Sequence, residues 1–83
     1  MKFDLEIRPQ AVRDFRRLSP EVARRIIAKI EALRDNLAGD VKRLTHFTPE
    51  YRLRVGDYRI LFALHGDRIM VYRVLHRREA YDR

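Results

Sequence analysis

The 83-residue sequence contains no cysteine and no tryptophan, few glycines and prolines, and a single serine, Ser19. The absence of cysteine excludes disulfides and cysteine metal sites. Ser19 precedes Pro20 and is explained as a helix cap, which leaves no serine for a Ser-His-Asp triad. The three glycines fit one helix end and two turns, so no phosphate-cradling glycine loop is expected. The three histidines are scattered, and their spacing predicts no metal site and no cofactor.

Long apolar runs are also absent. No run approaches the roughly 18 residues of a membrane span, and the first six residues alternate apolar with charged side chains, unlike a signal peptide. Hydrophobic residues make up 46% and charged residues 37% of the chain, which is typical of a globular protein. We therefore expect a single domain over residues 1–83, located in the cytoplasm, with no membrane partner.

The charge balance is strongly basic. Nineteen Lys and Arg residues against twelve Asp and Glu residues give a net charge of +7, and sixteen of the nineteen cations are Arg. An excess of Arg favours bidentate recognition of phosphate or carboxylate groups. A genome with GC-rich codons produces the same excess, so the position of the arginines must distinguish the two explanations.

The order of the predicted elements gives the fold class. Residues 3–7 alternate as a strand, 10–18 form an amphipathic helix, and a second helix starts at Pro20, includes Leu37 and stops at Gly39. A loop covers residues 38–50, and the period then changes to two, which predicts strands at 51–55, 58–64 and 68–75 before a polar tail. The predicted class is α+β in the order β-α-α-β-β-β. It comprises one small, twisted, mainly antiparallel sheet with a helical hairpin on one face.

Two short turns fix the expected register of the last three strands. Gly56-Asp57 as a two-residue turn places Arg54 opposite Arg59, and Gly66-Asp67 places Leu61 opposite Tyr72. The face expected to pack on the helices collects Leu53, Val55, Ile60, Phe62, Leu64, Ile69, Val71 and Leu75, and the other collects Arg52, Arg54, Arg59, Leu61, Tyr72, Val74 and His76. Arg73 falls on the core face, which requires either a position at the sheet edge or a β-bulge.

Three arginines on one sheet face, with no acid from these strands beside them, favour anion binding. Arg54 and Arg59 directly opposite each other are mutually destabilising unless an anion lies across them. The alternative is an ordinary solvated face. The tail His76-Arg77-Arg78-Glu79-Ala80-Tyr81 adds an imidazole suited to general acid–base catalysis, two cations and a phenol. The alternative is a basic terminus without function.

Three segments carry a family resemblance that covers essentially the whole chain: 41–44 (VKRL), 51–62 (YRLRVGDYRILF) and 76–81 (HRREAY). Together with the element order, they make the sequence resemble the RelE/ParE toxin superfamily of type II toxin–antitoxin systems. The resemblance implies a toxin inhibited by a cognate antitoxin, with which it forms a hetero-oligomer. RelE-type members are metal-independent endoribonucleases that cleave messenger RNA on the ribosome and so inhibit translation.

The resemblance also implies which residues act. The family's basic and tail positions fall at Arg52, Arg54, Arg59, Arg78 and Tyr81, and His76 stands where many relatives have a histidine. We expect Arg59, Arg78, Tyr81 and His76 to be catalytic, and Arg52, Arg54, Arg77, Lys42 and Arg43 to bind RNA.

The sequence departs from the RelE pattern at Arg52 and Arg54, where that pattern has lysines. Because arginine does not lose its proton, neither residue is a base, and Tyr81 or His76 is left for that role. ParE-type members share the fold but poison DNA gyrase without cutting RNA. That activity and a non-catalytic nucleic-acid-binding module are the alternatives to the RNase.

Overall fold

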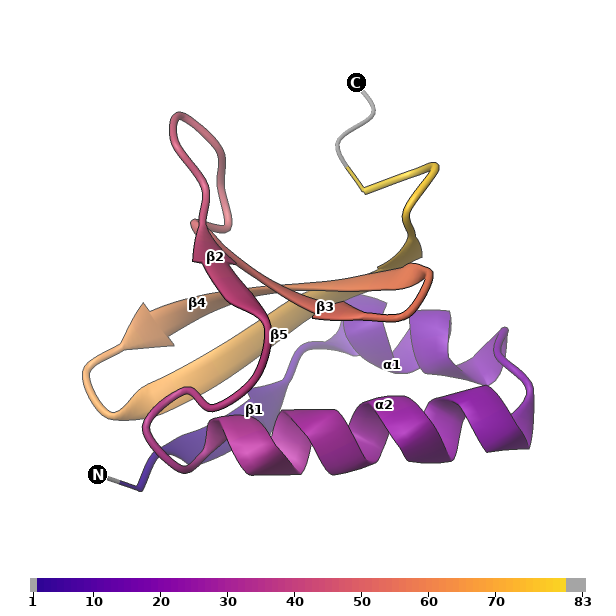
Figure 1. The fold of residues 1–83 in the computed structure, drawn as a ribbon, viewed down its shortest axis with the longest axis horizontal. Coiled ribbons are helices and arrows are strands. Elements are labelled where there is room, and N and C mark those ends of the chain that lie inside the picture. Colours follow the sequence, from indigo (N-terminus) through magenta and orange to yellow (C-terminus); the bar gives the residue numbers. More distant parts are fainter. Residues whose placement is uncertain (1, 81–83) are drawn as a thin grey trace.

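The computed structural model describes residues 2–80, and these residues form the predicted α+β fold. The elements are β1 (Asp4–Ile7), α1 (Pro9–Arg16), α2 (Pro20–Leu33), β2 (Val41–Arg43), β3 (Tyr51–Val55), β4 (Tyr58–His65) and β5 (Arg68–His76). Both helices lie on one side of a twisted sheet (Figure 1). Neither helix in the described part of the chain has the length and apolar character that a membrane span requires.

The sheet has the strand order β1-β5-β4-β3-β2. The first strand pairs with β5 in parallel, and all other neighbours are antiparallel. The strand β2 was missed in the sequence, where residues 38–50 were assigned to a loop. Three residues are too few to show a period, and β2 is recognisable only from its pairing with β3.

The second helix begins as predicted but ends earlier. The Ser19 hydroxyl accepts a hydrogen bond from the Val22 N–H at 3.3 Å, and Pro20 occupies the first turn. The helix stops at Leu33 rather than at Gly39, because the N-terminal segment forms a hydrogen bond with the residue that follows it. The Phe3 N–H donates to the Arg34 carbonyl at 2.8 Å. Leu37 still packs against the core, but from a turn with positive φ.

The main core lies between the sheet and the helices. Its fully buried side chains are Ile26, Ile30, Leu33, Leu53, Ile60, Phe62, Ile69 and Val71. The strand residues of this set, Leu53, Ile60, Phe62, Ile69 and Val71, were all predicted to face the helices. On the opposite, outer face of the sheet, the 44–50 loop and the turn at residues 77–80 both project away from the helices (Figure 1).

Candidate functional site

Four cations from three adjacent strands gather on the outer face of the sheet. Arg54 pairs directly with Arg59 across β3 and β4, and Lys42 pairs with Arg52 across β2 and β3. Their neighbours Leu53, Val55 and Ile60 are buried in the core, so strand alternation directs the cations away from the helices. We refer to Lys42, Arg52, Arg54 and Arg59 as the arginine face. The predicted register of the first turn is confirmed.

Local contacts hold two of these guanidiniums in place. Arg52 Nη1 donates to the Asp40 carbonyl at 3.0 Å and to its carboxylate at 3.3 Å. Asp40 precedes β2, so the acid that partly compensates this face comes from outside the three long strands. Arg59 Nη1 donates to the carbonyls of Gly56 at 2.9 Å and Tyr58 at 3.0 Å. Arg54 is exposed, and a guanidinium there is accessible to an anion.

A β-bulge in β5 changes the face of every residue that follows it. Phe62 pairs with Val71, but the preceding Leu61 pairs with Arg73, so Tyr72 is the extra residue. The predicted pairing of Leu61 with Tyr72 is therefore wrong. The bulge resolves the anomalous position of Arg73, which lies opposite Leu61 on the outer face.

Two apolar assignments are reversed by the same bulge. Val74 pairs with Ile60 and is buried in the main core, whereas Leu75 pairs with Arg59 and joins the outer face. The sequence predicted the opposite for Val74 and Leu75. Side chains alternate between the two faces of a strand, and one extra residue reverses this alternation. A register counted from the second turn is therefore wrong for every residue after the bulge.

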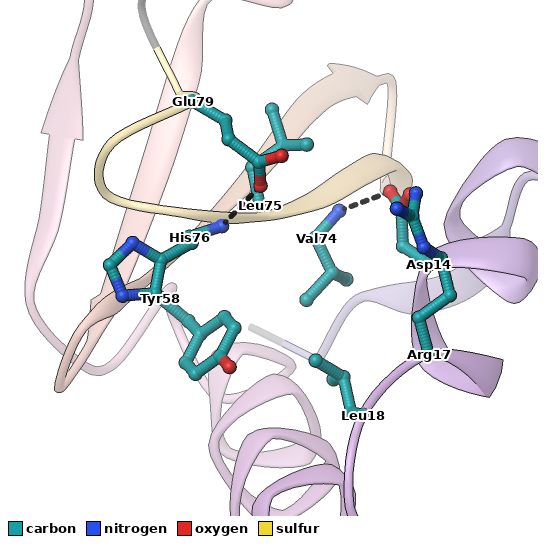
Figure 2. A pocket seen from close by; sticks show the side chains of 8 residues that line it. All are labelled: Asp14, Arg17, Leu18, Tyr58, Val74, Leu75, His76 and Glu79. Atoms are coloured by element: carbon teal, nitrogen blue, oxygen red, sulfur yellow. Dashed lines mark hydrogen bonds between the residues drawn. The ribbon is translucent and has the colours of Figure 1, made fainter.

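His76 is also on the other side from the one predicted. It pairs with Tyr58, whose neighbour across β3 is the core residue Val55. The rings of His76 and Tyr58 meet edge to face, with centroids 5.5 Å apart, in a pocket beside α1 (Figure 2). Its Nδ1 accepts a hydrogen bond from the Arg78 N–H at 3.2 Å. The prediction that His76 lies on the arginine face was wrong, although its contact with Arg78 is direct.

The remaining predicted residues lie around the arginine face or outside the described residues. Arg43 pairs with Tyr51, so strand alternation places its side chain on the helix side of the edge strand β2. The Arg77 N–H donates to the Asp57 carbonyl at 2.7 Å, and Arg78 is exposed in the turn after β5. Tyr81 lies outside the described residues.

The structure adds a buried acid that sequence reasoning did not identify. The Asp14 carboxylate accepts a hydrogen bond from the Val74 N–H at 2.8 Å (Figure 2). It also accepts hydrogen bonds from Arg73 Nε at 2.8 Å and Nη2 at 3.1 Å. Val74 requires this acceptor because β1 stops pairing at Val71 and leaves the rest of that edge of β5 open. The hydrogen bond to Asp14 raises the pKa of Arg73 above its ordinary value.

A second pocket lies on the outer face next to the arginine face. It has a volume of about 320 Å³ and is lined by Phe47, Thr48, Pro49, Leu61, Arg73, Leu75, Glu79 and Ala80. Leu61 and Ala80 are almost fully buried there, at 3% exposure each, although neither belongs to the main core. Within residues 2–80, no group of three or more acidic or histidine side chains is arranged to hold a metal ion.

Comparison with known proteins identifies the family. A model of the ParE toxin of the type II toxin–antitoxin system parDE matches residues 5–81. The chain is 36% identical over 76 residues to Toxin RelE3 of Methanocaldococcus jannaschii, a match that covers 86% of each protein.

Solved structures agree with this identification. The RelB–RelE antitoxin–toxin complex of Methanococcus jannaschii contains a chain 34% identical to this one, with a TM-score of 0.76 over 92% of this chain and 94% of that one. The toxin–antitoxin complex RelBE2 of Mycobacterium tuberculosis, at 20% identity, shares the fold with a TM-score of 0.79 over 92% and 99% of the two chains. The chain therefore belongs to the RelE/ParE superfamily of toxins from type II toxin–antitoxin systems.

Proposed function

We propose that this toxin is a ribosome-associated endoribonuclease that cleaves messenger RNA and thereby inhibits translation in the cytoplasm. The observation that carries the proposal is the direct pairing of Arg54 with Arg59 on the outer face, flanked by Lys42 and Arg52. Like charges placed directly opposite each other destabilise a sheet, and a phosphate between them removes that cost. An RNA backbone supplies such phosphates at regular intervals.

The proposed reaction needs no metal. The 2′-oxygen of a nucleotide attacks the adjacent phosphorus, and the bond from phosphorus to the 5′-oxygen breaks. A base takes the proton of the 2′-hydroxyl, an acid protonates the leaving 5′-oxygen, and the products are a 2′,3′-cyclic phosphate and a 5′-hydroxyl. The phosphodiester carries one negative charge, and a second develops around the phosphorus as the 2′-oxygen attacks, so guanidiniums placed there lower the barrier.

The cations divide into two roles in this proposal. Arg59 and Arg78 stabilise the charge that develops on the phosphate, and Arg52 and Arg54 hold the backbone in position. Arg52 suits a positioning role because its guanidinium is held by hydrogen bonds to both the carbonyl and the carboxylate of Asp40. Lys42 and Arg77 extend the basic surface along the RNA, whereas Arg43 lies on the helix side of the edge strand and is left out of this role.

Tyr81 is the proposed proton carrier. His76 is the less suitable of the two bases considered, because its ring packs against Tyr58 on the helix side and its Nδ1 is engaged by the Arg78 N–H. In this arrangement His76 holds the turn that carries Arg78. Loss of His76 then acts on the cleavage step through Arg78, whereas loss of the Tyr81 hydroxyl acts on proton transfer itself.

We further propose that a cognate antitoxin covers an apolar groove on the helix side. The groove has a volume of about 380 Å³ and is lined by Leu5, Ile7, Val12, Phe15, Ile27, Ile30 and Glu31. Ile27 is 50% exposed and Val12 is 37% exposed, and exposed apolar side chains that line one groove are typical of an interaction site. The relatives solved as RelB–RelE complexes support an antitoxin partner, and the basic surface favours an acidic, amphipathic segment.

Single-turnover cleavage of message on translating ribosomes tests the proposed activity. We expect Arg59→Ala to slow cleavage by roughly 10²–10³-fold, as for the loss of other groups that stabilise developing charge. Arg24→Ala, which removes an exposed cation from α2, is the matched control and should cleave at the parent rate. Equal cleavage by both variants would exclude the assigned role of Arg59.

Gyrase poisoning is the second candidate, because the matching family model describes a ParE toxin. A supercoiling assay with purified gyrase, run in parallel, separates the two functions. Inhibition of supercoiling without cleavage of ribosome-bound message would replace the RNase proposal by the gyrase one.

Two further variants assign the proton carrier. Tyr81→Phe removes one hydroxyl, and we expect it to abolish the step that takes the proton from the 2′-hydroxyl. His76→Gln should slow cleavage but leave the shape of the pH–rate profile unchanged, because in this proposal His76 positions Arg78 and takes no part in proton transfer. Full activity in Tyr81→Phe would remove Tyr81 from the mechanism.

A further inference from the structure

The pocket beside the arginine face combines apolar walls with one fixed guanidinium. Leu61 and Leu75 form part of its floor, and Arg73 and Glu79 are its charged groups. Its volume of about 320 Å³ is within the range of small-molecule sites, which is about 300–1,000 Å³. The pocket adjoins the arginine face directly, since Leu61 pairs with Arg52 on one side and Arg73 on the other, and Leu75 pairs with Arg59.

The guanidinium of Arg73 is held in place by the buried carboxylate of Asp14. Asp14 is 5% exposed and binds Arg73 side-on through Nε and Nη2, so the plane of the guanidinium is fixed by a buried partner. Arginine has five N–H donors, and Asp14 takes two of them, which leaves three for a ligand or water. The Arg73 side chain remains 34% exposed. Such a side chain is a pre-oriented donor group.

The charges around Arg73 argue against a phosphate in this pocket. Asp14 neutralises the guanidinium, and Glu79 adds a second carboxylate close enough to raise the pKa of Arg73. These two carboxylates and one guanidinium leave a net charge of −1, which disfavours phosphate, whereas a neutral ligand with hydrogen-bond acceptors meets apolar walls and fixed donors. In single-stranded RNA the neutral, flat group with acceptors on its edge is the base, which proteins recognise through contacts to its face and its edge.

We infer that this pocket binds a nucleobase of the RNA, with Arg73 donating to acceptors on the base edge and Asp14 acting as the positioning residue that orients Arg73. The inference rests on the proposed function, because it requires RNA on the arginine face. The cations of that face then bind the backbone without regard to sequence, and the pocket supplies the sequence preference. Guanine, whose O6 and N7 acceptors lie side by side, matches the two N–H groups of a guanidinium best.

A purely structural ion pair between Asp14 and Arg73 is the alternative, and one double variant separates it from the inference. Asp14→Asn together with Arg73→Met keeps an acceptor for the Val74 N–H and an unbranched chain in the place of Arg73. It removes one charge of each sign, so the net charge of +7 is unchanged. Buried ion pairs replaced in this way often leave stability unaffected, and thermal unfolding checks that the variant is folded.

The measurement is binding of four short single-stranded RNAs that differ in one base and carry a 2′-deoxy sugar at that position, so that they are not cleaved. The parent should discriminate between the best and worst base by roughly 5- to 150-fold, with guanine preferred. In the folded double variant the difference should fall below about twofold, while the dependence of affinity on salt stays the same because the backbone contacts remain. The Arg24→Gln variant, changed far from the pocket on α2, is the control and should keep the preference.

Two results would overturn the inference: the same base preference in the folded double variant as in the parent, or no base preference in a parent that binds these RNAs. Failure of the proposed function is separate, since it shows as a parent that binds no RNA or cleaves no ribosome-bound message.

Discussion

Replacement of Asp14 by alanine should be among the most destabilising single changes in this protein. The variant leaves the Val74 N–H without its acceptor at 2.8 Å and Arg73 without its carboxylate. A buried N–H left unsatisfied costs about 1–3 kcal/mol. Removing one partner of a fully buried ion pair costs about 3–5 kcal/mol of stability. The Arg73 side chain is 34% exposed, so water replaces part of its lost interaction with Asp14.

We therefore expect the free energy of unfolding to fall by about 3 kcal/mol in Asp14→Ala. A domain of 83 residues has a total stability of about 4–12 kcal/mol, so the variant loses roughly a quarter to three quarters of it. The midpoint of thermal unfolding should fall by roughly 12–24 °C. Asp14→Asn keeps an acceptor oxygen for Val74 and should lose clearly less.

Urea and thermal unfolding, followed by circular dichroism, measure these differences. Asp4→Ala is the matched control, because it removes an exposed acid from β1 and changes the net charge by the same amount. It should remain within about 0.5 kcal/mol of the parent. If Asp14→Ala and Asp4→Ala lose the same stability, the bulge does not depend on the Asp14 carboxylate and the reasoning fails.

Two further predictions concern other elements. The hydrogen bond from Arg8 lowers the pKa of Glu6, so Glu6 stabilises the fold above its unfolded pKa near 4.5 and loses this contribution as the pH falls through the lower, folded value. Arg8→Gln should raise the pKa of Glu6 toward its ordinary value in a carboxyl titration by NMR, and an unchanged pKa would assign the shift to another group. Gly66→Ala, at φ +64° in open space, should cost about 1 kcal/mol in urea unfolding. Gly39→Ala should cost at least twice as much, because φ is +127° and the added methyl carbon lies 2.9 Å from Leu53 Cδ1 in the core, and equal losses would contradict that contact.

Several features followed from the sequence because they depend on local chemistry. Ser19 and Pro20 fixed the start of α2, since a cap and a first-turn proline act within four residues. The two-residue turn at 56–57 fixed the pairing of Arg54 with Arg59, since turn length determines register in a hairpin. Arg52, Arg54 and Arg59 of the arginine face were therefore predictable from the sequence, whereas Lys42 joins them only through the pairing of β2 with β3.

Only the tertiary structure decided the rest of the candidate site. Asp14 appears in the sequence as one of many charged residues of a short amphipathic helix, and its partners lie 59 and 60 residues further along the chain. It is buried because β1 ends at Ile7 and leaves the Val74 N–H without a strand partner, a condition that exists only when α1 packs beside β5. The bulge at this point turns Arg73 and Leu75 to the outer face and His76 to the helix side. Periodicity could not reveal this reversal, because one inserted residue exchanges the two faces of a strand and its cause is a contact between residues far apart in the sequence.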